Sequence, residues 1–241
     1  YQGPTLLGYL ETIETQSLQL QKPLRFPVQW VNRPNLDFRG FSGTIESGAA
    51  NVGDPIRILP SGETARIKEI ILFDETLESG QSGQAVTITL DREVDASRGD
   101  VIASSTAPCE ISDQFEIDIV WMDQDPGHQG RTYWLKIGTS TVNAHITELK
   151  HKININTFED LPASKLELND LAVITIKADK PIAFETYSEC APMGACILID
   201  RISGQTVAAG MIKFALRRAK NVHHQKLDIN KETRRNLNGH T

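Results

Sequence analysis

The chain has 241 residues, of which 39% are hydrophobic and 23% charged, and its formal net charge is −6 at pH 7. These proportions are typical of a globular protein and exclude a disordered or fibrous chain. The sequence has no apolar run of the roughly 18 residues that a membrane-spanning helix requires. Its acidic balance argues against broad binding to nucleic acid.

The length allows one large domain or two ordinary ones, and turn residues that recur about every eight to twelve positions favour two. The charge is unevenly distributed, because residues 213–241 contain eight Lys or Arg and two acidic residues. That tail has a net charge of +6, which leaves −12 for the rest of the chain. We interpret the tail as a solvated linker; contact with nucleotide phosphates or with a neighbouring acidic domain is the alternative.

The cysteines are Cys109, Cys190 and Cys196, an odd number without C-x-x-C spacing. A disulfide framework or a zinc site is therefore not expected, and the thiols are predicted to be buried or half-buried in a reducing cytoplasm.

The N-terminal part, residues 1–22, is expected to hold a short helix and a linker. Apolar residues spaced by three and four follow Pro4-Thr5, which predicts an amphipathic helix whose apolar positions are Leu6, Leu7, Leu10 and Ile13. The chain begins at Tyr1 without Met or a signal peptide. We expect it to be a fragment, with this helix closing a preceding domain.

Residues 23–108 are predicted to form a closed β-barrel of about six or seven short strands. Alternation over residues 38–58 predicts a hairpin with a tight turn at Ser47-Gly48 and glycines at positions 40, 43, 48 and 53. Glycines at this spacing suit a strongly bent barrel, because they accept φ > 0 and allow close backbone approach. Pro27, inside the first strand, predicts an edge or a bulge.

Residues 111–217 repeat the alternation and predict a second β-barrel, with Ser203-Gly204 as the turn between its last two strands. Residues 218–241 are predicted to be an extended linker with a short helix near residues 230–237. The expected fold is all-β, with two consecutive barrels between a short helix and a linker.

No nucleotide-phosphate loop, H-E-x-x-H pair or G-x-S-x-G elbow is present. The adjacent His223 and His224 point to opposite faces of an extended chain, so they are not expected to share a metal. The turn Asp123-Gln124-Asp125 resembles the start of a calcium loop but lacks its later glycine and glutamate. We therefore predict no catalytic, cofactor-binding or metal-binding residue in this chain.

We expect the remaining histidines and the tryptophans to have structural roles. His128 is expected in an exposed turn, and His145 and His151 on or beside strands. The three tryptophans are expected to pack the cores, namely Trp30, Trp121 and Trp134.

Several motifs resemble the second and third domains of the translational GTPases of the elongation factor Tu class, which are β-barrels. The motifs are Arg39-Gly40, Gly43, Gly48, Val52-Gly53-Asp54, residues 78–83, residues 97–103 and residues 199–212. Within this class the sequence is more similar to the large, GTP-binding subunit of ATP sulfurylase (sulfate adenylyltransferase). That similarity rests on residues 1–7, 26–34, 38–43, 168–170 and 183–187. Residues 221–236 resemble the connector to a fused adenylylsulfate kinase.

This resemblance implies that the parent protein takes part in sulfate assimilation in the cytoplasm and forms adenylyl sulfate and pyrophosphate from ATP and sulfate. In that family a separate small subunit transfers the adenylyl group, and GTP hydrolysis on the large subunit drives the step. GTP and Mg would bind the preceding GTPase domain, and ATP would bind the small subunit and the kinase domain. The implied partners are the small subunit and the chain's own GTPase domain, without nucleic acid or membrane.

We therefore expect residues 23–217 to relay the state of the GTPase domain to the small subunit, and the fragment alone to be inactive. The family usually has an Asn-Arg pair and a Thr-Gly where this chain has residues 189–194, and only the glycine is kept. Contacts that the family makes through that arginine are not expected here.

Three alternatives stay open. Domains of a translation factor would bind aminoacyl-tRNA, although the acidic body argues against this. An independent small-molecule enzyme would have a deep, polar-lined pocket, whereas relay barrels are expected to have none. A purely structural module would not respond to the GTP state of the parent.

Overall fold

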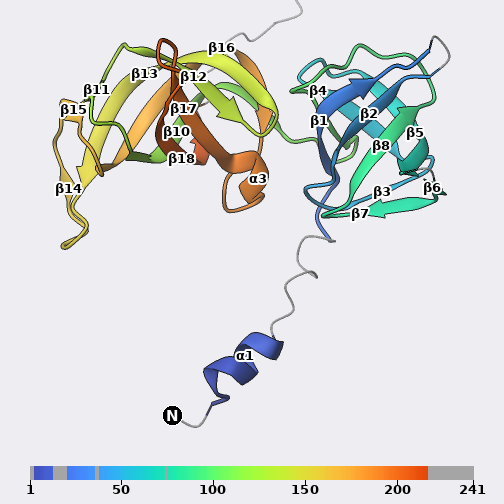
Figure 1. Cartoon of the computed structure of the whole chain (residues 1–241), viewed down its shortest axis with the longest axis horizontal. Coiled ribbons are helices and arrows are strands. Elements are labelled where there is room, and N and C mark those ends of the chain that lie inside the picture. The colour runs from blue at the N-terminus through green and yellow to red at the C-terminus, as the bar shows by residue number, and fades with distance from the viewer. Residues whose placement is uncertain (1–2, 13–20, 36–37, 74, 217–241) are drawn as a thin grey trace, which may run out of the picture.

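The computed structural model describes residues 3–12, 21–35, 38–73 and 75–216. The chain forms a short helix, α1 (Leu6–Thr12), and two β-barrels that lie side by side (Figure 1). The prediction of an all-β fold with two consecutive barrels and a short N-terminal helix is confirmed. The predicted C-terminal linker and its helix lie outside the described residues, as does Ile13 of the predicted apolar face. In the part of the chain that is described, no helix is long and apolar enough to cross a membrane.

Barrel 1 is a closed ring of six strands in the order β4-β9-β1-β2-β8-β5, completed by pairing of β4 with β5. Short strand β6 extends the ring beside β5, and β3 pairs with β7. The strands are β1 (Arg25–Asn32), β2 (Gly40–Thr44), β3 (Ala49–Asn51), β4 (Pro55–Leu59), β5 (Thr64–Leu72), β6 (Glu75–Leu77), β7 (Ser79–Gln81), β8 (Ala85–Leu90) and β9 (Val101–Ser104). Closure leaves no long open edge, which limits edge-to-edge aggregation.

The predicted hairpin over residues 38–58 is wrong. β2 pairs with β1 and β8, whereas β4 pairs with β5 and β9, so the two strands are not neighbours. The glycines nevertheless act as predicted. A side chain at Gly43 would place its Cβ 2.3 Å from the carbonyl oxygen of Pro27, and Gly48 has φ +73°. These glycines let the chain bend closely around the first strand instead of forming a hairpin.

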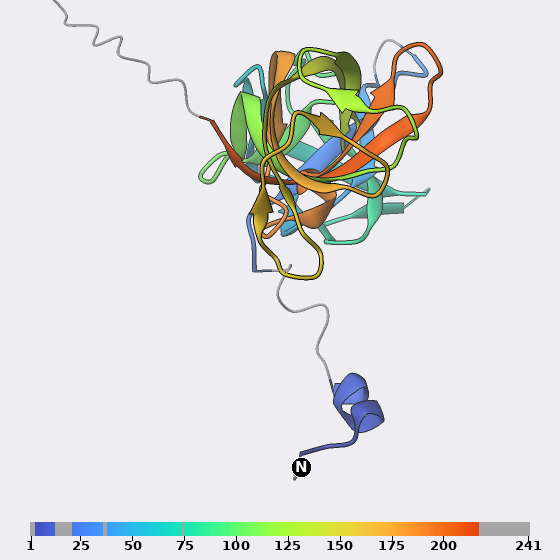
Figure 2. The ribbon, with the colours of Figure 1, turned by 90° about the vertical axis from the view of Figure 1, so that its left-hand side faces the viewer.

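Barrel 2 is also a closed ring of six strands, in the order β12-β17-β18-β10-β16-β13, completed by pairing of β12 with β13. Viewed from its own end, its strands encircle the core (Figure 2). The elements are β10 (Glu110–Trp121), β11 (Gly127–His128), β12 (Thr132–Ile137), β13 (Ser140–Ile153), β14 (Asp160–Leu161), β15 (Lys165–Leu166), β16 (Leu171–Phe184), α3 (Ala191–Gly194), β17 (Ala195–Asp200) and β18 (Thr206–Ala215). The predicted turn at Ser203-Gly204 joins β17 to β18, and Gly204 has φ +72°.

Each barrel has its own apolar core, but the tryptophans are not distributed as predicted. Trp121 is buried in the core of barrel 2, whereas Trp30 and Trp134 are 62% and 38% exposed. A bulge between Val28 and Trp30 shifts the register of β1, so that Trp30 points outward although Val28 points inward. On β12, Tyr133, Leu135 and Ile137 are buried and face the core, whereas Trp134 lies between them in the sequence and faces outward.

Candidate functional site

The histidines and acidic residues singled out from the sequence do not come together. His128 is exposed on β11, and His145 and His151 are half-buried on β13. His151 Nε2 lies 3.2 Å from a carboxylate oxygen of Asp160. Among the described residues there is no group of three or more His, Cys, Asp or Glu placed to hold a metal. The pair His223-His224 lies outside the described part of the chain.

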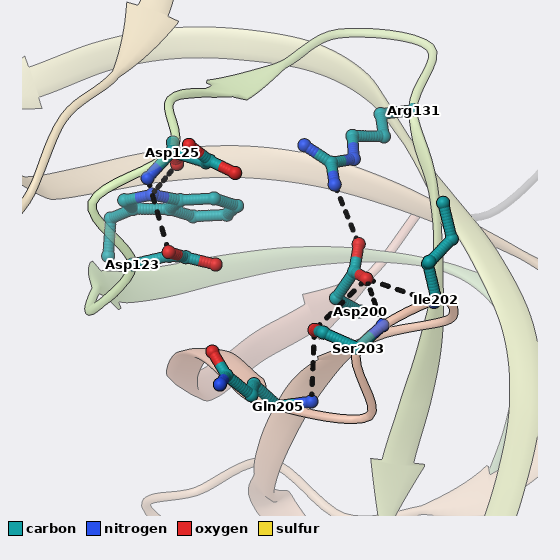
Figure 3. A network of polar contacts seen from close by, with 8 residues as sticks. Asp123, Asp125, Arg131, Asp200, Ile202, Ser203 and Gln205 are labelled. Carbon is teal, nitrogen blue, oxygen red and sulfur yellow. Dashed lines mark hydrogen bonds and ion pairs between the residues drawn. The ribbon is translucent and has the colours of Figure 1, made fainter.

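The turn after Trp121 holds the tryptophan in place. The indole Nε1 of Trp121 donates to the carbonyl oxygen of Asp125 at 3.0 Å, and the backbone N–H of Asp125 donates to Asp123 Oδ1 at 3.1 Å (Figure 3). These contacts close a short side-chain-to-backbone turn over the core. The acidic turn that resembled a calcium loop therefore stabilises the fold.

Beside this turn, Asp200 is the centre of a polar network on barrel 2 (Figure 3). Its Oδ1 accepts hydrogen bonds from the backbone N–H groups of Ile202 and Ser203, both at 2.9 Å, and Arg131 Nη2 lies 2.7 Å from Oδ2. The backbone donors, first Ser203 and then Ile202, together with Arg131, lower the pKa of Asp200 to about 2. This carboxylate is therefore fully paired and fixes the turn between β17 and β18.

The two barrels contact each other at a junction that has a small apolar core of its own. Residues of both barrels and of the connecting segment are buried together there: Leu59, Val101, Ala103, Cys109, Ala183, Cys190 and Met193. A small gap of about 10 Å³ at this contact is lined by residues of both barrels. The buried apolar residues therefore join the two barrels directly.

Arg25 ties three segments together at the junction. Its Nε lies 2.6 Å from Glu185 Oε1 in barrel 2, and its Nη1 donates to the carbonyl oxygens of Leu24 at 2.9 Å and of Ala107 at 2.8 Å. Ala107 belongs to the segment that connects the barrels. The side chains of Arg25 and Glu185 are only 8% and 16% exposed, so the pair is shielded from water. Removing either partner would leave the other charge nearly buried and unpaired.

Residues 189–194, for which the resemblance implied a departure from the family pattern, include residues of this junction. Lys22 Nζ donates to the carbonyl oxygen of Glu189 and lies 3.7 Å from its carboxylate. A Cβ on Gly194 would lie 2.3 Å from the backbone nitrogen of Tyr187, so only glycine fits. The close approach of these two backbones accounts physically for the glycine at this position.

The three thiols are buried and free, as predicted. Cys109 and Cys190 lie in the junction, and Cys196 lies in the core of barrel 2. Burial raises the pKa of Cys109 and of Cys196 to about 12, and it raises the pKa of Cys190 as well. Because the thiolate is the reactive form, none of the three is a nucleophile in the folded chain.

Sequence reasoning did not single out Arg25 or Glu185. Both lie in motifs on which the family resemblance rests or beside them, but neither was given a role. One sequence feature pointed to them: a charged residue directly beside the buried run of a strand, Arg25 before Phe26 and Glu185 after Phe184. Charged residues in such positions are seldom buried without a partner.

The sequence predicted no deep pocket lined by polar groups in these barrels. Barrel 1 has a pocket of about 230 Å³ on its outer face, lined by Arg39, Thr89 and further polar and aromatic residues. It contains no arrangement of nucleophile and base.

The matches to known proteins agree with this architecture. Residues 114–213, in barrel 2, match the family described as GTP-eEF1A C-terminal domain-like. In structure the chain is similar to sup35 complexed with GDP, with a TM-score of 0.78, 22% identity and coverage of 90% of this chain and 53% of that one. At this identity the likeness concerns the fold alone. The fold and these matches define a pair of elongation-factor-like β-barrels.

The similar sequences are more specific. The chain is 45% identical over 237 residues, 98% of its length, to the bifunctional enzyme NodQ of Rhizobium sp. strain N33. It is 42% identical over its full length to the bifunctional enzyme CysN/CysC of Xylella fastidiosa, and 43% identical over 216 residues, 89% of its length, to sulfate adenylyltransferase subunit 1 of Laribacter hongkongensis. It spans 37%, 39% and 45% of the lengths of these three relatives.

The resemblance indicated by the sequence motifs is confirmed: the chain is a homologue of sulfate adenylyltransferase subunit 1 and of the bifunctional enzymes, and corresponds to part of their length.

Proposed function

We propose that this chain forms the two non-catalytic barrels of the GTP-binding subunit of a sulfate adenylyltransferase. The parent enzyme would form adenylyl sulfate and pyrophosphate from ATP and sulfate in the cytoplasm, coupled to GTP hydrolysis. The observation that supports this best is 43% identity to a sulfate adenylyltransferase subunit 1 over 89% of the chain. The barrels contribute no catalytic group, and the chain alone is inactive.

The partners of the barrels in this proposal are a GTPase domain of the same protein and a small catalytic subunit. GTP and Mg bind the GTPase domain, and ATP binds the small subunit and, in a fused form, an adenylylsulfate kinase domain. The homology to two bifunctional enzymes supports the fused form.

Within this proposal the junction has a mechanical role. A relay needs an element with two arrangements that both of its sites bias. The small apolar core and the Arg25–Glu185 pair join the barrels, so this junction is the element through which they are coupled. A displacement that the GTPase domain imposes on one barrel therefore reaches a subunit bound to the other.

The alternative is a translation factor that binds the aminoacyl end of a tRNA with barrel 2. The likeness to sup35 supports the fold of such a protein, but its 22% identity is well below the 42–45% identity to the sulfate adenylyltransferase and bifunctional relatives. The net charge of −12 outside residues 213–241 also disfavours an RNA ligand.

A binding experiment tests the proposal. The small sulfurylase subunit is immobilised and offered the 241-residue chain, and then the full-length protein with GTP or with GDP. We expect the chain to be retained and the full-length protein to bind with an affinity that depends on the nucleotide. Retention of charged tRNA on a filter, without retention by the small subunit, would favour the translation factor instead.

A further inference from the structure

The outer face of barrel 2 carries a row of apolar residues across neighbouring strands (Figure 1). Ile197 of β17 is opposite Ala209 of β18, which is opposite Val120 of β10. Val120 is in turn opposite Leu171 of β16. Neighbours of these residues along their strands are buried in the core, so the row itself faces outward. These neighbours are Ile119, Trp121, Ala172, Cys196, Leu198 and Ala208. The outward face of an antiparallel sheet is usually polar, so this row is an exception.

A groove of about 530 Å³ lies over this row. Small residues such as Ala209 leave room for it among larger side chains. Asp118 is the single charged residue among the described residues that line the groove. The side chains of Val120, Tyr187 and Met211 also line it and are 37%, 41% and 44% exposed. A continuous apolar surface of this kind marks an interaction site.

The charges beside the groove indicate what kind of surface fits it. Asp118 Oδ1 lies 3.4 Å from Lys213 Nζ, and Asp170 Oδ2 lies 2.5 Å from Lys152 Nζ, so both carboxylates are paired within barrel 2. Lys136 stands at the β12 end of the row and makes no ion pair with any residue that the structure describes. The complementary surface is therefore apolar, with an acidic residue opposite Lys136.

An apolar surface with paired rim charges fits a partner that stays bound. Interfaces between permanently associated subunits are strongly apolar, whereas contacts between domains that move relative to one another are more polar. In the function proposed above, the GTPase domain moves with the state of its nucleotide, and the small catalytic subunit is a separate chain. The groove therefore fits the small subunit better than the GTPase domain.

The groove is also continuous with the junction between the barrels. Tyr187 and Ala195, which line it, flank the segment that contains α3. Cys190 and Met193 of this segment are buried in the apolar core of the junction. A subunit seated in the groove would thus contact the segment through which barrel 2 packs against barrel 1.

We propose that this groove on barrel 2 is the docking site of the small catalytic subunit. The subunit places an apolar ridge over Val120 and Met211 and an acidic residue opposite Lys136. This inference rests on the proposed function, because it assigns a place to a partner that the proposed function requires.

Two methionines of barrel 2 provide a matched test. Met211 lines the groove and is 44% exposed, whereas Met122 is 42% exposed and does not line it. The full-length protein is treated briefly with hydrogen peroxide, with and without the small subunit, and mass spectrometry measures sulfoxide at each methionine. We expect similar oxidation rates in the free protein. Bound subunit should slow oxidation of Met211 about tenfold and leave Met122 unchanged.

A pair of variants of the full-length protein tests the same site through affinity. Met211→Glu should weaken binding to the immobilised small subunit about tenfold, because it places an unpaired charge in an apolar contact. Met122→Glu is the matched control and should bind like the wild type. Both positions are exposed, and a thermal melt verifies that both variants are folded.

The outcomes separate this inference from the proposed function. Wild-type protein that does not bind the small subunit would overturn the proposed function and this inference with it. Wild-type binding that neither protects Met211 nor is weakened by Met211→Glu would overturn this inference alone. Protection of Met211 in the full-length protein without the subunit would also overturn it, since another domain or a second copy would then cover the groove.

Discussion

The arginine at the junction between the barrels and the arginine at the pocket on barrel 1 differ in whether their buried polar atoms have hydrogen-bond partners. At the junction, Arg25 donates to two carbonyl oxygens and one carboxylate, and the apolar residues around it are closely packed. At the pocket, Arg39 Nε and Thr89 Oγ1 are buried without partners beside about 230 Å³ of open volume. A fully satisfied buried polar group stabilises a structure, whereas an unsatisfied one lowers its stability. The junction is therefore expected to contribute more to stability than the pocket.

The largest effect is expected at the junction. Arg25→Met should lower the free energy of unfolding by about 3 kcal/mol, because it leaves Glu185 nearly buried without a counter-charge. Chemical denaturation measures the change. Arg33→Met is the matched control, since Arg33 and Glu93 are both exposed, and it should cost about 0–1 kcal/mol. Equal effects of the two variants would contradict the role given to Arg25.

The same variant should also open the junction locally. Alkylation of Cys109 and Cys190, which lie there, should become faster in Arg25→Met, whereas Cys196 in the core of barrel 2 should stay protected. Mass spectrometry after short exposure to an alkylating reagent distinguishes the three sites. Uniform acceleration at all three cysteines would mean global unfolding and would argue against a separate junction.

A smaller loss is expected for Gly194→Ala. The new Cβ would lie 2.3 Å from the Tyr187 nitrogen, which forces the two backbones apart and costs about 1–3 kcal/mol. Gly62→Ala is the comparison, because Gly62 has φ +84° but no neighbour within 4 Å. It should lose only about 1 kcal/mol, from backbone strain. If both variants lost the same amount in thermal unfolding, the close approach at Gly194 would not matter for packing.

The stability that Asp200 contributes is expected to depend on pH. Its pKa in the folded chain, about 2, lies below its ordinary value of 3.8, so its ionised form stabilises the fold. That contribution is complete above about pH 4 and is lost as pH falls towards 2. The stability difference between the wild type and Asp200→Asn, from denaturation at a series of pH values, should shrink over this interval. A difference that is constant from pH 6 to about 2 would contradict the pairing.

The smallest effect, and one of opposite sign, is expected at the pocket. Thr89→Val removes an unpaired buried hydroxyl and should stabilise the chain by up to about 1 kcal/mol. Thermal unfolding of the variant and of the wild type tests this. Destabilisation would mean that the hydroxyl has a partner and that the pocket resembles the junction after all.

Much of the fold follows from the sequence, since alternation and turn residues gave two β-barrels and the turn at Ser203-Gly204. Strand partners did not follow, because periodicity shows where a strand runs but not which distant strand completes its hydrogen bonds. That is why β2 and β4 were wrongly paired. Trp30 was misplaced because a bulge shifts the alternation by one residue. Pro27 indicated a bulge or an edge in this strand, but not the position at which the alternation shifts. The junction was missed for a similar reason: Arg25 and Glu185 are 160 residues apart and meet only in the folded chain.

The claim that the barrels relay the GTP state rests on the junction, so one measurement tests it most directly. The ratio of sulfurylase turnover in GTP to that in GDP is measured for the full-length protein with its small subunit, in the wild type, Arg25→Met and Arg33→Met. We predict that Arg25→Met lowers this ratio towards one while GTP hydrolysis continues, and that Arg33→Met leaves it unchanged. A full ratio in an Arg25→Met protein whose junction thiols have become reactive would contradict the relay.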